Sequence, residues 1–240
     1  MRLARRTEPS DRSVIERMDT DCRDYADYAA CLGDLARVNA AMMTHRPMLA
    51  WLGRQLDALP PAAAVSVLDV GCGQGDALRA IASLFRARGR TAQLVGIDIN
   101  PWAIRAATEA TPATDAIAFM QSDVFAYAPD RAPDIVISSL FAHHLSNADL
   151  VLFLRWLDHT ARVGWFIGDL ERHPLSFAGF PLIARAVGWH RFVGEDGRAS
   201  IARSLRAPEW RRLLRDAGIG GARVSHHVPF RIAVSCIRPS

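Results

Sequence analysis

The feature that most constrains the fold is the stretch VSVLDVGCGQGDA at residues 65–77. An apolar, β-branched run ends at Asp69, and glycines follow at alternate positions: Gly71, Gly73 and Gly75. A strand that passes through a glycine turn into a helix is how open α/β sheets build a nucleotide crevice. Glycine is needed there because the backbone turns sharply and approaches the ligand closely. The stretch therefore predicts an α/β sheet with a nucleotide site.

Asp76, the residue after this turn, indicates which nucleotide. A dinucleotide-binding turn has glycine or alanine at this position, so that a pyrophosphate can lie against the helix N-terminus. A carboxylate suits the positive end of a helix and repels a phosphate. We therefore expect a nucleoside ligand without phosphates.

The segment LDVGCGQGD resembles the first motif of the class I S-adenosylmethionine (SAM) methyltransferases. The ligand of that family is a sulfonium nucleoside with an amino-acid tail, which agrees with the missing phosphate site. The resemblance covers residues 65–168 well, and the last helix and hairpin less closely. It implies SAM as the cofactor and a Rossmann-like α/β sheet that ends in a C-terminal antiparallel hairpin.

Further cofactor candidates stand where predicted strands end. Asp98 closes a strand at residues 93–98, the place where nucleotide-binding sheets put an acid for ribose hydroxyls. The resemblance implies that Asp123 accepts a hydrogen bond from the adenine amino group and that Val124 packs on the ring; the alternative for Asp123 is to cap its own loop. The complete set of cofactor candidates is Arg46, Asp69, Gly71, Cys72, Gly73, Asp98, Ile99, Asp123, Val124 and Ser139.

Arg46 belongs to this set through the family resemblance alone. In similar methyltransferases an arginine of the N-terminal cap meets the cofactor's carboxylate, where a bidentate pair gives both energy and geometry. The alternative is a solvated surface arginine.

The catalytic candidates are the adjacent histidines His143 and His144, which follow a predicted strand at residues 134–139. Ligands of open parallel sheets lie beyond the carboxyl ends of the strands. The segment lacks the Asn-Pro-Pro-Tyr type signature of amino-directed methyltransferases. It is similar to the His-containing stretch of phenolic O-methyltransferases, a short match that puts His143 on their general base. The alternative is that one or both rings cap the next helix, near Asn147.

The chemistry supports a histidine at this point. A phenol has a pKa of ~10, and a histidine near ~6.5 is a suitable proton acceptor at cellular pH. Asp169 leaves a predicted strand at residues 163–168 at the same edge of the sheet. We expect this acid to position the substrate or to orient His143.

The chain divides into four predicted parts. Residues 1–62 form an N-terminal helical cap with a charged, frayed start at 1–19, and residues 63–170 form the SAM-binding core. Residues 171–205 are an inserted lid with a loop at 194–197, and residues 206–240 supply a helix and hairpin that complete the core. The lid is rich in aromatic residues, which favours an apolar or aromatic acceptor, although packing beneath the lid explains them equally well.

Composition excludes several classes. The chain has 240 residues, a net charge of +4 and no lysine, which rules out Schiff-base catalysis through lysine. The arginines are scattered, so we expect no nucleic-acid partner. The four cysteines lack zinc-type spacing, and no metal is expected. No apolar run reaches the length of a membrane span, so we expect a cytoplasmic protein; monomer and homodimer both stay open.

The sequence thus predicts methyl transfer from SAM to a small molecule, with a phenolic, quinone-like or polyketide oxygen as the first expectation. Three rivals remain: a carbon or nitrogen acceptor, an RNA methyltransferase, and a SAM-binding protein without turnover.

Overall fold

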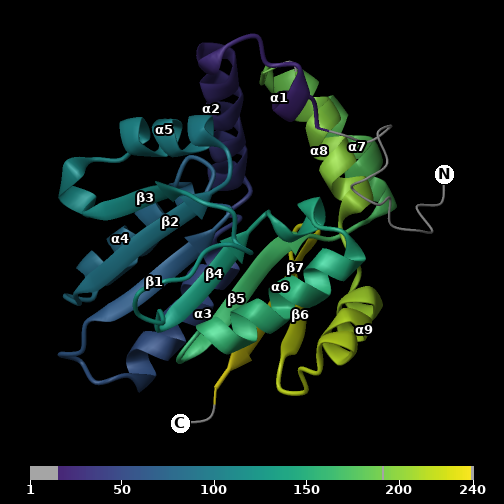
Figure 1. Cartoon of the computed structure of the whole chain (residues 1–240). Coiled ribbons are helices and arrows are strands. Elements are labelled where there is room, and N and C mark those ends of the chain that lie inside the picture. Colours follow the sequence, from purple (N-terminus) through teal and green to yellow (C-terminus); the bar gives the residue numbers. More distant parts are fainter. Residues whose placement is uncertain (1–15, 191, 239–240) are drawn as a thin grey trace.

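The computed structural model describes residues 16–190 and 192–238, and within them the chain forms one mixed sheet (Figure 1). The strand order is β3-β2-β1-β4-β5-β7-β6. The parallel strands are β1 (Val65–Val70), β2 (Ala92–Asp98), β3 (Ile117–Gln121), β4 (Ile135–Ser139) and β5 (Gly164–Leu170). Strand β7 (Arg231–Ile237) runs antiparallel to both β5 and β6 (Arg223–His227). The predicted α/β class and its C-terminal hairpin are confirmed.

The strand order reverses between β1 and β4, and this reversal locates the crevice. In open α/β sheets, ligands bind beyond the carboxyl ends of the strands at such a switch point. The central strands are apolar on both faces: Ile135, Val136 and Ile137 of β4 are fully buried. A strand buried on both faces is expected where helices cover both sides of a parallel sheet.

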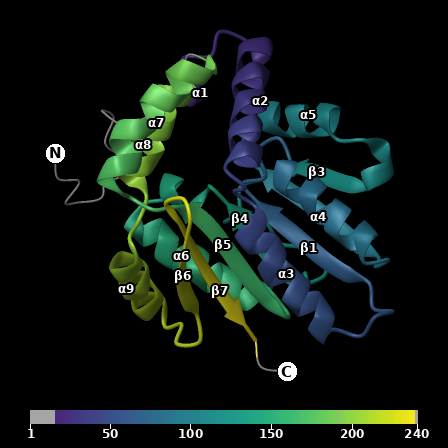
Figure 2. The ribbon, with the colours of Figure 1, turned by 180° about the vertical axis from the view of Figure 1, so that it is seen from behind.

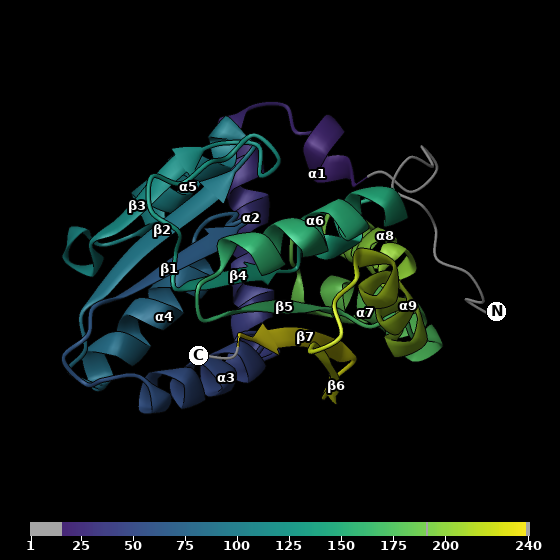
Figure 3. The ribbon, with the colours of Figure 1, turned by 60° about the horizontal axis from the view of Figure 1, so that its bottom comes forward.

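Helices cover both faces of the sheet, as Figures 2 and 3 show. On one face α3 (Arg46–Ala58) and α4 (Asp76–Ala87) pack through Trp51 and Phe85. On the other face α6 (Asn147–Thr160) and α9 (Ala207–Ala217) pack through Phe153 and Trp210. Helix α5 (Pro101–Ala110) lies against β2 and β3. The two apolar layers hold the sheet rigid beneath the crevice.

Four further helices lie above the carboxyl ends of the strands, at the top of Figure 1. They are α1 (Arg17–Thr20), α2 (Tyr25–Ala41), α7 (Pro174–Val187) and α8 (Val193–Arg203). A third apolar cluster joins them to α5, with Tyr28, Ala103 and Val193 among its members. The first residues of the predicted cap, 1–15, lie outside the described residues. No helix in the described ranges is both long enough and apolar enough to cross a membrane.

The predicted loop at residues 194–197 is wrong, because these residues begin α8. Gly194 packs against Ala184 of α7, and a Cβ on Gly197 would overlap the ring of Phe180. The two glycines therefore let α7 and α8 approach closely. Tertiary packing outweighs the low intrinsic helix propensity of glycine at these positions.

Candidate functional site

The turn between β1 and α4 has a backbone that only glycine adopts readily. Gly71, Gly73 and Gly75 all have positive φ, at 69°, 52° and 76°. A Cβ on Gly71 would lie 2.5 Å from the ring of Phe141. The Asp98 carboxylate closes the turn from β2, because its Oδ2 accepts a hydrogen bond from the Gly73 amide at 3.0 Å. The turn thus depends on glycine and is tightly held.

Two acids on either side of the glycine turn, Asp69 near the end of β1 and Asp76 at the start of α4, give the turn its electrostatic character. Asp69 is 1% exposed and neither of its carboxylate oxygens has a hydrogen-bond partner. Burial, and then the charges of Asp76 and Asp98, raise the pKa of Asp69 well above its usual value. Burial opposes ionisation of Asp76 too, but hydrogen bonds from His45 and Asn39, both at 3.0 Å, lower its pKa. Such a site suits a cationic ligand and repels phosphate.

One cavity of about 670 Å³ extends from this turn to β7. Nearly all the predicted site residues line it: Asp69, Gly71, Cys72, Gly73, Asp98, Ile99, Asp123, Val124, Ser139, His143 and His144. Their segments are far apart in sequence, but the parallel strands bring them to one edge of the sheet.

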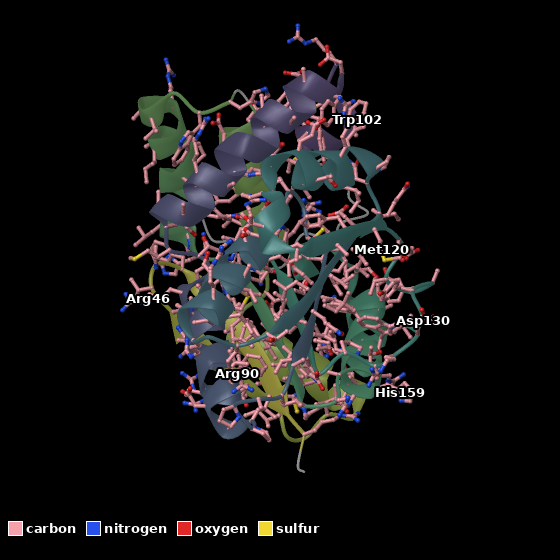
Figure 4. The ribbon with its side chains drawn as sticks, turned by 90° about the vertical axis from the view of Figure 1, so that its left-hand side faces the viewer. Arg46, Arg90, Trp102, Met120, Asp130 and His159 are labelled. Carbon is pink, nitrogen blue, oxygen red and sulfur yellow. The ribbon has the colours of Figure 1, made fainter. Side chains whose placement is uncertain are left out.

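Arg46 is the exception, because it is not among the residues that line this cavity. It lies at a separate shallow depression beside Leu49 and Arg88. Figure 4 shows its side chain pointing outward at the edge of the molecule. The structure therefore does not bring Arg46 together with the other cofactor candidates.

Asp123 takes up the loop-capping role that the sequence left open. Its Oδ1 accepts a hydrogen bond from the Phe125 amide at 3.0 Å. The residue also lines the cavity beside the buried Val124. One carboxylate oxygen thus fixes the loop, and the capping role and a place in the cavity are compatible.

His143 is held by a carboxylate on a neighbouring strand. It lies in a short 3₁₀ turn, η3 (Ala142–His144), directly beyond β4. Its Nδ1 donates to Asp169 Oδ1 at 2.7 Å, and its backbone amide donates to Asp169 Oδ2 at 2.9 Å. Strand β5 runs two residues past its predicted end, so Asp169 lies within the strand. The expected contact between Asp169 and His143 is present.

The helix that follows has its own cap. Ser146 is the N-cap of α6, and its Oγ accepts a hydrogen bond from the Asp149 amide at 3.1 Å. The capping role considered for His143 and His144 is therefore wrong. Their two rings lie against each other with centroids 4.4 Å apart.

Glu16 completes this group and had no signal in the sequence, since it stands in the charged start that was predicted to fray. Its Oε1 lies 3.7 Å from His143 Nε2 and 3.8 Å from His144 Nε2. The same oxygen accepts hydrogen bonds from Ser200 Oγ, at 2.5 Å, and from the Arg203 guanidinium. Glu16 therefore joins helix α8 to the histidine turn.

The two histidines have opposite pKa shifts. Burial lowers the pKa of His143, but the Asp169 and Glu16 carboxylates outweigh it and raise the pKa to about 9. For His144, burial together with the neighbouring His143 outweighs Glu16 and lowers the pKa to about 4. At neutral pH His143 is a cation between two carboxylates, and His144 is neutral.

Glu16, His143 and His144 also offer three ligand atoms within 4.8 Å of one another, close enough together to hold a metal ion. However, the Arg203 guanidinium pairs with Glu16, and the cationic His143 pairs with Asp169. A divalent ion would have to displace both positive charges. The arrangement therefore favours proton transfer over metal binding.

Comparison with known sequences agrees with this geometry. Residues 67–164 match the family model described as a methyltransferase domain. The 2-methyl-6-phytyl-1,4-hydroquinone methyltransferase of Synechocystis sp. is 32% identical over 144 residues. The match covers 57% of this chain and 42% of that protein, so the chain spans about two fifths of the curated relative.

Solved structures share the fold over most of the chain. The plantazolicin methyltransferase BpumL, in complex with a monoazolic desmethylPZN analog and S-adenosylhomocysteine (SAH), has a TM-score of 0.60 and 17% identity. The match covers 92% of this chain and 91% of that one. Magnesium protoporphyrin IX methyltransferase from Synechocystis PCC 6803, with bound SAH, has a TM-score of 0.56 and 18% identity, covering 83% and 84%. At these identities the likeness shows the fold.

Proposed function

Because this chain has the fold of the class I SAM-dependent methyltransferases and carries a methyltransferase domain at residues 67–164, we propose that it transfers a methyl group from SAM to a small molecule. The acceptor atom is an oxygen of a phenolic, quinone-like or polyketide-type compound. The observation that carries the proposal is one cavity lined both by the glycine turn and by His143, whose Nδ1 is bound by Asp169.

SAM is held by the residues around the turn. The glycines let the adenosyl group approach the backbone, and Asp98 receives the ribose hydroxyls. Asp123 and Val124 face the adenine. The buried carboxyl of Asp69 has no hydrogen-bond partner. A sulfonium or ammonium group of the cofactor supplies a positively charged partner for it, which favours the ionised carboxylate.

The transfer itself requires alignment and the loss of one proton. SAM already carries an activated methyl group, so the protein mainly holds the nucleophile in line with the methyl carbon. The acceptor hydroxyl gives its proton to Nε2 of neutral His143, while Asp169 holds Nδ1. The oxygen then bonds to the methyl carbon, the carbon–sulfur bond breaks and its electron pair stays on sulfur. The products are a methyl ether and SAH.

The raised pKa of His143 suits this task. A base with a pKa of about 9 is well matched to a phenol of pKa ~10, although only its neutral fraction can accept the proton. The methylation rate should therefore rise about tenfold per pH unit below pH 9 and then level off. His144, with a pKa of about 4, would give a flat profile above pH 6 if it were the base.

The test is methyl transfer from labelled SAM to a panel of phenols between pH 6 and 10. His143→Gln should lower kcat by about 10²–10⁴-fold while SAH affinity, measured by calorimetry, stays within threefold. His144→Gln is the matched control and should retain the alkaline rise. A wild-type rate that is flat from pH 6 to 9 would exclude His143 as the base.

Methylation at carbon is the second candidate, because the acceptor in the relative's name is a hydroquinone, which offers ring carbons as well as oxygens. A phenolate carries negative charge on ring carbons as well as on oxygen, so the same base prepares either nucleophile. Proton NMR of the product separates the two, because an O-methyl group and a ring methyl group have different chemical shifts. Either product requires SAM and His143.

A further inference from the structure

Arg231, the first residue of β7, is a cation in the cavity for which the described residues supply no counter-ion. It lines the cavity together with Leu170, Pro229 and Phe230. Its Nη2 donates one hydrogen bond, to Thr44 Oγ1 at 3.1 Å, and its buried Nε has no partner. Burial lowers the pKa of this guanidinium to about 10, and the nearby Asp169 only partly opposes that effect.

Asp169, whose charge acts on Arg231, and Glu171, which follows the pairing partner Leu170 in sequence, are both engaged elsewhere. Asp169 Oδ1 accepts hydrogen bonds from His143 Nδ1 and from the Leu170 amide, and its Oδ2 accepts one from the His143 amide. Glu171 pairs with His226 through Oε2 at 2.9 Å. Leaving a partly buried guanidinium without an ionic partner is costly, and an arginine fork offers five N–H donors. The arrangement points to an anion that arrives with a ligand.

The position of Arg231 assigns this anion to the part of the cavity next to His143, where the methyl acceptor is proposed to lie. Arg231 stands directly opposite Leu170 in the β5–β7 ladder, one residue from Asp169, which holds His143. Strand β1, with the glycine turn, lies three strands away, or ~14 Å at ~4.8 Å per strand. Arg231 is thus nearer to the acceptor oxygen at His143 than to the adenosyl site.

We propose that Arg231 binds a carboxylate of the methyl acceptor, which makes the substrate a hydroxyaryl or polyketide-type acid. The inference rests on the proposed function, since it takes the acceptor oxygen to lie at His143. A planar carboxylate receives two parallel hydrogen bonds from a guanidinium, which fixes orientation as well as charge. The apolar side chains of Leu170, Pro229 and Phe230 accommodate the body of such an acid.

The experiment compares hydroxybenzoic, hydroxycinnamic and alkyl-substituted hydroxybenzoic acids with their own primary amides. The wild-type protein should prefer each acid by about 10- to 100-fold in kcat/KM, the usual contribution of a charge-assisted pair. Arg231→Met should abolish this preference, mainly through KM, and Arg231→Lys should keep part of it. Arg223→Met, an exposed arginine of the neighbouring strand β6, is the control and should change nothing.

Calorimetry separates failure of the inference from failure of the proposed function. The acids and amides are titrated into the wild-type and Arg231→Met proteins saturated with SAH, which requires no turnover. Acids that bind wild-type protein no tighter than amides would overturn the inference, even if both are methylated. A tenfold loss of SAH affinity in Arg231→Met with an unchanged acid preference would also overturn it, because the guanidinium would then hold the cofactor's carboxylate.

Discussion

The two ends of the cavity are built in different ways. The cofactor half comprises the glycine turn with Asp69, Asp76, Asp98 and Asp123, which lie at or just beyond the carboxyl ends of β1, β2 and β3. The turn is fixed by the positive φ of its glycines, by backbone hydrogen bonds from the Gly71 and Cys72 amides to the Ile97 carbonyl, and by the bond from the Gly73 amide to Asp98. The acceptor half comprises Glu16, His143, Asp169 and Arg231, which come from four distant segments and are positioned by side-chain contacts. The cofactor half should therefore be sensitive to added volume, and the acceptor half to altered charge.

The largest effect is expected from a change of charge in the acceptor half. Asp169→Asn keeps the volume but presents an amide to His143 in place of the carboxylate that holds Nδ1. We expect kcat to fall by about 10³-fold, or ~4 kcal/mol, with the alkaline pKa of the rate profile below 9. SAH affinity should stay within threefold.

The control for this variant is Glu171→Gln, two residues further on. Glu171 pairs with the exposed His226, and its loss should alter kcat by less than threefold. Equal losses of kcat and of SAH affinity in Asp169→Asn would show that the two halves are not independent.

An alanine at Gly71 tests the cofactor half by adding volume and leaving the charge unchanged. Its Cβ would meet the Phe141 ring at 2.5 Å, in a backbone with φ of 69°. Strain and overpacking together should lower the stability of the ligand-free protein by about 3–4 kcal/mol. Gly73→Ala is the matched control, because φ is also positive there but no protein atom lies within 4 Å of the added Cβ. It should lower the stability of the ligand-free protein by about 1–2 kcal/mol, from strain alone. Similar losses of stability in both variants, measured by thermal unfolding without SAH, would mean that the contact with Phe141 is unimportant.

The same contrast explains what the sequence could predict. The cofactor half is local: alternate glycines, an acid after each strand and apolar runs are all visible in short windows of sequence. Glu16 lies 127 residues from His143 in the chain, and only tertiary packing of α8 brings it into place. Arg231 looked like any polar position of a terminal strand. Arg46 shows the opposite case: a resemblance placed it at the cofactor, and the structure has its exposed side chain pointing outward from the first turn of α3.

The pH dependence of the free energy of unfolding tests the charges of the acceptor half without any substrate. Since the folded pKa of His143 is raised from 6.5 to about 9, its stabilising contribution is complete below pH 6.5 and is lost as pH rises through 9, a decline of about 3 kcal/mol. His144 has a lowered pKa, so stability is also lost as pH falls from 6.5 to 4. The combined contribution of the two histidines is therefore largest near pH 6.5, and urea unfolding across the pH range measures it as the difference between the wild-type protein and its His143→Gln and His144→Gln variants. His143→Gln should remove the alkaline decline, and a wild-type curve that is flat from pH 6.5 to 9 would contradict the charge network.

The smallest expected effect concerns residues 17–18, which we call the strap because their contacts with Asp196 hold the preceding residue, Glu16, in place. Asp196 of α8 accepts hydrogen bonds from the backbone amides of Arg17, at 2.7 Å, and Met18, at 3.0 Å. Asp196→Asn replaces one acceptor with a donor, and should lower stability by about 1–2 kcal/mol. Glu195→Gln is the control, because its ion pair with Arg17 is exposed and should contribute less than 1 kcal/mol.

The kinetic consequence of this variant makes the comparison sharper. Glu16 is the residue before Arg17, so a loosened strap displaces the carboxylate that faces both histidines. The KM of the acceptor should rise severalfold while SAH affinity stays constant, because none of the strap contacts reaches the glycine turn. If SAH affinity fell by the same factor, the lid would act on both halves at once, and the cavity would behave as one cooperative unit.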